Sequence, residues 1–188
     1  GFAALSITPA MFKGKRILIK PNLVEPHSGK EHINTNPLLV KRIVEQCLEA
    51  GAKRVYVFDY TCDDWRRAYR SSGIESAAKE AGAVIAPGDG ERYFQPVTVG
   101  GKKLKRAEEH ELILESDVFI NVPVLKHHSG ASLTISMKNL MGVIQRRGHL
   151  CQNLDRFRCR RNARPRSHDR GGPRISAHPS FNSHSCGG

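Results

Sequence analysis

Three short motifs place lysine beside asparagine or histidine directly after apolar stretches of the chain. They are Lys20-Pro-Asn22, Asn121 to His128 (NVPVLKHH) and Ser136 to Gly142 (SMKNLMG). Lysine ammonium and asparagine amide groups donate hydrogen bonds to anionic or carbonyl oxygens. In an open α/β fold, ligands bind in the crevice beyond the carboxyl ends of the strands. The sequence therefore predicts one rim, lined by these motifs, that holds a small anionic or carbonyl ligand.

The motifs supply a set of candidate site residues. The candidates for ligand binding are Lys20, Asn22, Thr35, Asp59, Asn121 and Asn139. The candidates for catalysis are Lys126, His128 and Lys138. His128 is the preferred acid or base, because an imidazole titrates near neutral pH. No metal site is predicted, since the adjacent His127 and His128 have no cysteine or carboxylate near them in the sequence.

Each motif also has an ordinary explanation. A lysine after a strand can be a solvated surface side chain, and an asparagine beside proline can cap a turn. Asp59 follows a second apolar run, where a dinucleotide-binding fold holds a ribose, but the preceding loop contains no G-x-G-x-x-G. Asp59 could equally bind a metal, pair with Lys20 or cap a loop.

The elements that would carry these residues follow from hydrophobic periodicity. Apolar runs predict strands at 16–20, 54–59, 83–86 and 118–122, with a further strand at 133–136. Helices are expected after Pro37, across 74–81, across 108–115 and from about Met137. The run from 94 to 107, with Gly100-Gly101 in its middle, predicts an antiparallel hairpin. The fold class is therefore α/β, with a mostly parallel, Rossmann-like sheet that is flanked by helices and is incomplete.

Charge and composition divide the chain at about residue 150. The net charge of +12 is shared equally, because residues 1–150 hold 22 basic and 16 acidic side chains and residues 151–188 hold 8 arginines and 2 aspartates. The first part is an α/β domain by its periodicity. The second part has the composition of an arginine-rich disordered tail, or of a sequence read in a shifted frame.

Other classes of protein fit the composition less well. The five cysteines form no C-x-x-C pair, which argues against a disulfide framework and favours a reducing, cytoplasmic location. No apolar run is long enough to span a bilayer, so no membrane partner is expected. Nucleic-acid binding through the tail ranks last, because the tail offers few aromatic side chains for stacking.

Four segments together resemble one family of bacterial and archaeal proteins, the domain of unknown function 362 family. They are GKRILIKPNLV, TNPLLVKRIVEQCLEAGAKRVYVFD, SDVFINVPVLKHH and LTISMKNLMGVI, and the resemblance covers about Phe12 to Leu150. It implies an α/β domain without an assigned activity. Some members are described as iron–sulfur cluster-binding and carry a ferredoxin-like module. No cluster motif occurs in this chain, so a cluster and a ferredoxin-like partner are implied by the resemblance alone.

The resemblance and the motifs leave several functional hypotheses. The preferred one is a domain that binds a small anionic or carbonyl ligand through lysine and asparagine side chains at strand ends. The alternatives are a redox-associated iron–sulfur module, a truncated and inactive product, and an RNA-binding protein. Whether the chain is an enzyme, and which cofactor it would use, stays open.

Overall fold

The computed structural model describes residues 7–24, 33–62, 64–100, 105–128 and 132–145. Its centre is a four-stranded sheet made of β1 (Arg16–Pro21), β2 (Arg54–Val57), β3 (Val84–Ile85) and β6 (Val118–Val122). The strand order is β3-β2-β1-β6, and every pairing is parallel. The predicted fold class is therefore confirmed. The predicted tail at 151–188 lies outside the described residues.

The first crossover forms as its residue types dictate. Helix α1 (Pro37–Glu49) begins with Pro37 in its first turn, and the Asn36 side chain accepts a hydrogen bond from the Leu38 backbone N–H. It ends before Gly51, which takes a φ of 85° that favours glycine. Since α1 joins two parallel neighbours, β1 and β2, the segment is a βαβ unit.

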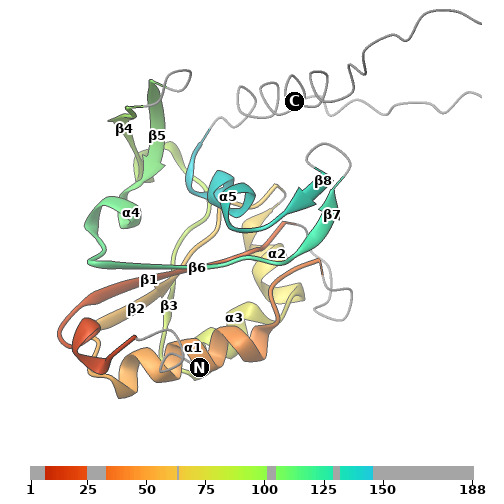
Figure 1. Ribbon diagram of the computed structural model, residues 1–188. Coiled ribbons are helices and arrows are strands. Elements are labelled where there is room, and N and C mark those ends of the chain that lie inside the picture. The colour runs from red at the N-terminus through yellow and green to blue at the C-terminus, as the bar shows by residue number, and fades with distance from the viewer. Residues whose placement is uncertain (1–6, 25–32, 63, 101–104, 129–131, 146–188) are drawn as a thin grey trace, which may run out of the picture.

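The sheet separates two layers (Figure 1). Helices α1 and α3 (Ile74–Glu80) cover one face, while α4 (Glu111–Glu115) and β4 (Phe94–Thr98) with β5 (Arg106–His110) lie on the other. Successive side chains of β1 point alternately to the two faces of the sheet. Ile17 and Ile19 pack with α1 on one face, and Leu18 packs with Phe58 and Phe94 on the other. Full burial of each such side chain stabilises the fold by about 1.5–3 kcal/mol. Lys20 continues the alternation on the Leu18 face.

Three elements differ from the sequence prediction. The predicted helix over 108–115 is wrong in its first part, because Glu108 to His110 continue β5 and pair with Phe94 to Pro96. Cross-strand pairing and the burial of His110 there outweigh the helix propensity of the glutamates. Helix α2 (Trp65–Ser71) was not predicted, although Asp64 caps it through the Arg67 backbone N–H.

The third difference is a second antiparallel pair of strands. Strands β7 (Lys126–His128) and β8 (Ser132–Thr134) form a hairpin after β6, where the sequence predicted only a strand at 133–136. Helix α5 (Ser136–Asn139) follows, and a 3-10 turn, η5 (Leu140–Val143), completes the segment. Two short 3-10 turns, η2 (Pro9–Met11) and η4 (Glu91–Tyr93), complete the described elements. The helix predicted from about Met137 is thus present but short.

Candidate functional site

The parallel pairing places the carboxyl ends of three neighbouring strands, β2, β1 and β6, side by side. Lys20 lies opposite Asn121 in the β1–β6 register, so the two side chains project from the same face. Asp59 follows β2, the other neighbour of β1. Residues that are up to 101 positions apart in the chain therefore meet because the sheet order places β1 between β2 and β6.

Lys20 is at the centre of a polar group that we call the ion-pair cluster: the buried Lys20, Asp59 and Asn139, and the half-buried Asn121. The Lys20 side chain is only 1% exposed, and its Nζ lies 2.6 Å from Asp59 Oδ1. The same ammonium donates to the carbonyl of Pro21 at 2.9 Å and to Asn139 Oδ1 at 3.2 Å. Of the interpretations open for Asp59, the structure thus shows the pairing with Lys20.

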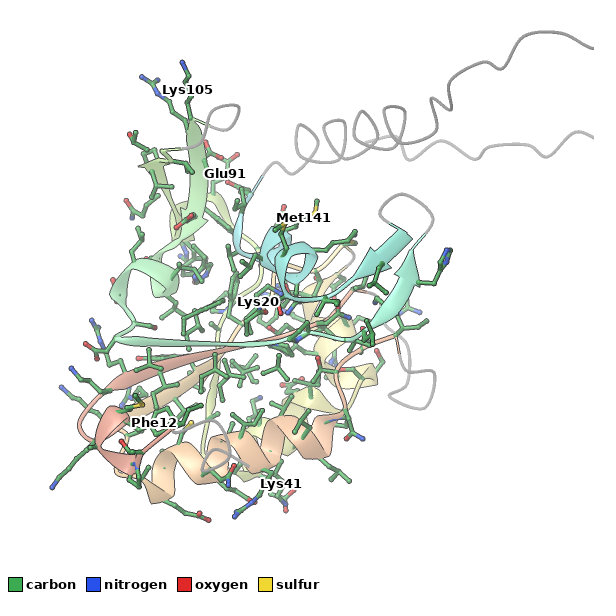
Figure 2. All side chains as sticks on the ribbon, viewed as in Figure 1. Phe12, Lys20, Lys41, Glu91, Lys105 and Met141 are labelled. Atoms are coloured by element: carbon green, nitrogen blue, oxygen red, sulfur yellow. The ribbon has the colours of Figure 1, made fainter. Side chains whose placement is uncertain are left out.

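Backbone and amide groups hold the rest of this cluster in place. The second carboxylate oxygen of Asp59 accepts from the Leu23 backbone N–H at 2.8 Å. Asn139 Nδ2 donates to Asn121 Oδ1 at 2.7 Å, and Asn121 Nδ2 donates to the Ser136 carbonyl at 3.0 Å. Helix α5 is therefore tied to the ends of β1 and β6 by side-chain amides. Figure 2 shows Lys20 beneath the α5 segment.

Tyr69 is a component that sequence reasoning missed. Its hydroxyl oxygen accepts a hydrogen bond from the Asp59 backbone N–H at 2.6 Å, and the side chain is completely buried. Burial, together with the nearby Asp59 carboxylate, raises the pKa of Tyr69 well above its ordinary value, so the phenol stays protonated. The available signal was the helical spacing of Trp65, Ala68 and Tyr69 after the capping Asp64.

A second group, the loop-anchor cluster of Asn22, Thr35 and Lys126, lies beside the first. Thr35 Oγ1 donates to the carbonyl of Val122 at 2.8 Å and accepts from the Asn22 backbone N–H at 2.7 Å. Asn22 Nδ2 and Lys126 Nζ both donate to the carbonyl of Ile33, at 2.6 and 2.8 Å. These bonds fix the two described ends of the segment that connects β1 to α1.

The remaining candidates are less closely integrated. Lys138 is half-buried on α5, next to Asn139 of the ion-pair cluster. His127 is exposed on β7. The backbone of His128 belongs to β7, and its side chain lies outside the described residues. The structure thus brings together Lys20, Asp59, Asn121 and Asn139, and places Asn22, Thr35 and Lys126 next to them.

The described residues include few of the ligands that an iron–sulfur cluster requires. Such clusters are held by several cysteine thiolates. The described cysteines are Cys47, buried on α1 where burial raises the pKa of its thiol to about 11, and Cys62, exposed in a loop. No group of three or more His, Cys, Asp or Glu side chains suited to a metal occurs within the described part of the chain. The residues described here do not fit a cluster.

The family follows from sequence comparison. A domain of unknown function, DUF362, matches residues 17–163. The chain belongs to the DUF362 family. The matched region includes every candidate residue of both clusters.

The chain is also similar to a curated protein from a strain of Synechocystis sp.. The thylakoid-associated protein sll1697 of Synechocystis sp. is 27% identical over 131 residues, which is 70% of this chain and 40% of that protein. The chain therefore spans less than half the length of this relative. No solved structure matches the chain. Within the described residues, no helix combines the length and the apolar character that crossing a bilayer requires. The cytoplasmic location stays a prediction.

Proposed function

We propose that the rim formed by the two clusters binds a small ligand that carries an anionic or carbonyl oxygen. One observation carries this proposal: a fully buried lysine, Lys20, ends a central parallel strand and is surrounded by Asp59 and Asn139. Burying a lysine costs several kcal/mol before its partners offset the loss of hydration. This buried lysine lies at the carboxyl ends of the strands, where ligands generally bind in an open α/β fold.

Charge balance assigns different roles to the three lysines of this proposed site. Asp59 pairs with Lys20, and both side chains are almost completely buried, so Lys20 does not hold the anionic end of the ligand. Lys126 and Lys138 are both half-buried, and each carries an ammonium group. In the proposal, Lys126 and Lys138 hold the anionic end of the ligand, and the amides of Asn22, Asn121 and Asn139 orient a carbonyl oxygen. His128 is the candidate acid or base.

Calorimetric titration with pyruvate and with inorganic phosphate tests the proposal. Pyruvate presents a carboxylate and a ketone, whereas phosphate presents an anion alone, so tighter binding of pyruvate is expected if the amides contribute. Lys126→Gln keeps a donor for the Ile33 carbonyl but removes the charge. We expect it to weaken binding roughly tenfold, which corresponds to about 1.4 kcal/mol. Lys126→Arg keeps the charge and should bind more tightly than Lys126→Gln.

Lys79→Gln is the matched control, because Lys79 is an exposed lysine of α3 that pairs with Glu75. It should leave the titration unchanged. Absence of saturable binding by both compounds at millimolar concentration would contradict the proposal. Iron and visible absorption in anaerobically purified protein would instead favour the iron–sulfur alternative.

A further inference from the structure

The segment Ser136–Val143, which comprises α5 and η5, lies directly over the buried Lys20–Asp59 pair. A Cβ atom on Gly142 would overlap Asp59 Oδ1 and would lie 2.8 Å from both Cε and Nζ of Lys20. The φ angle of Gly142 is not in the left-handed region, so lack of space excludes a side chain at this position. Only glycine permits the segment to approach the pair this closely.

Polar contacts hold the segment Ser136–Val143 against the rest of the protein at several points. The Tyr60 backbone N–H donates to the Gly142 carbonyl at 2.9 Å, and Asn139 and Ser136 are bonded to the ion-pair cluster as described above. The apolar side chains of the segment are divided, since Met137 is 86% exposed and Leu140 is 40% exposed, whereas Val143 is buried. Segments with few buried apolar contacts open at lower free energy than the core.

We propose that Ser136–Val143 is a gate over the ion-pair cluster. In the closed state, Gly142 and Asn139 shut the Lys20 ammonium away from water. When the segment lifts, Asn139 and the Gly142 carbonyl leave together, and Lys20, Asp59 and Asn121 face solvent at the end of the sheet. The identity of what enters rests on the proposed function, but the opening itself is a property of the protein alone.

The opening can be measured without a ligand, by pulse acetylation of lysine amines followed by residue-resolved mass spectrometry. In the wild-type protein Lys20 should be acetylated far more slowly than the exposed Lys79. Gly142→Ala should hold the gate away from the pair and accelerate acetylation of Lys20 at least tenfold, or about 1.4 kcal/mol. Lys79 serves as the internal reference. Gly100→Ala is the matched control, because a Cβ there meets no atom within 4 Å.

Hydrogen exchange in the wild-type protein supplies a second measurement that does not depend on the variant folding. The amide of Tyr60 bonds to Gly142 across the gate, whereas the amide of Phe58, two residues earlier, bonds to Ile19 in the sheet. The gate predicts that Tyr60 exchanges through a local opening, well before Phe58. Equal protection of the two amides overturns the gate, and so does slow acetylation of Lys20 in folded Gly142→Ala.

The two proposals fail separately. Rapid exchange at Tyr60 without binding of pyruvate or phosphate supports the gate and contradicts the proposed function. Saturable binding together with equal protection of Tyr60 and Phe58 supports the proposed function and contradicts the gate.

Discussion

At the scale of single residues, the Lys20–Asp59 pair has the largest consequence for stability. The two side chains are 1% and 4% exposed, and their charged atoms are 2.6 Å apart. A buried pair repays its desolvation only when the remaining donors and acceptors are satisfied. Leu23 N–H and the Pro21 carbonyl meet that condition here. Removing one partner should therefore cost far more than the pair itself contributes.

We predict that Asp59→Asn lowers the free energy of unfolding by about 3–5 kcal/mol, because it removes the carboxylate that the buried Lys20 ammonium contacts at 2.6 Å. Lys20→Met should cost a similar amount, because it removes the ammonium that the buried Asp59 carboxylate contacts. Urea denaturation of both variants and of the double variant measures the coupling. The double variant should lose less free energy of unfolding than the two single variants lose together. Additive losses would mean that the two charges do not stabilise each other.

The positions of these residues could be predicted from sequence, but their contacts could not. Apolar runs predicted that Lys20 and Asp59 end neighbouring strands, and the parallel βαβ unit then places both residues at the carboxyl ends of the strands. The bond from Lys20 to Asn139 spans 119 residues and depends on where α5 settles after the second hairpin. The spacing of apolar residues in the sequence does not indicate where α5 packs. The requirement for glycine at 142 likewise becomes visible only when Asp59 and Lys20 are seen beneath it.

At the scale of elements, the sequence predicted best where local signals and tertiary packing agree. Helix α1 has its asparagine cap, its proline and its closing glycine in the expected places. The β5–α4 junction shows the opposite case, because pairing with β4 converts the expected first turn of a helix into strand. His110 lies at this junction and caps α4 by accepting from the Leu112 backbone N–H at 3.3 Å.

His110 predicts how stability depends on pH. Its ring is packed against Phe58, Tyr93 and Phe94, with a centroid separation of 4.0 Å from Phe58. Burial lowers the pKa of His110 to about 4, against a smaller opposing effect of the Pro87 backbone. The folded pKa lies below that of the unfolded chain, so the contribution to stability is complete above pH 6.5 and is lost as the pH falls toward 4.

We expect this loss to reach roughly 3 kcal/mol between those limits. His110→Asn keeps an acceptor for the Leu112 N–H but removes the titration. Urea denaturation across this pH range should show a smaller loss of stability on acidification for His110→Asn than for the wild type. Parallel pH profiles for the two proteins would contradict the assignment to His110.

At the scale of the whole molecule, the β7–β8 hairpin exposes an apolar face. His127 pairs with Leu133, and extending the register by one pair beyond Lys126 and Thr134 would place Leu125 opposite Ile135 on the same side. Leu125, Leu133 and Ile135 are 68%, 56% and 45% exposed. Lys126 projects from the other side, toward the Ile33 carbonyl. An antiparallel hairpin usually turns its apolar face inward, whereas three large apolar side chains at this one are exposed, and we expect them to form one apolar patch.

A contiguous patch of this kind binds hydrophobic dyes and promotes association, whereas single exposed leucines do neither strongly. We predict that Leu133→Lys lowers the fluorescence of bound anilinonaphthalene sulfonate and raises the protein concentration at which light scattering detects association. The free energy of unfolding should change by less than about 0.5 kcal/mol, because Leu133 is already exposed. Leu114→Lys, on α4 and 52% exposed, is the control and should change neither signal. If both variants bind the dye as the wild type does, the hairpin face is not the surface that the dye detects, and the apolar patch there does not govern association.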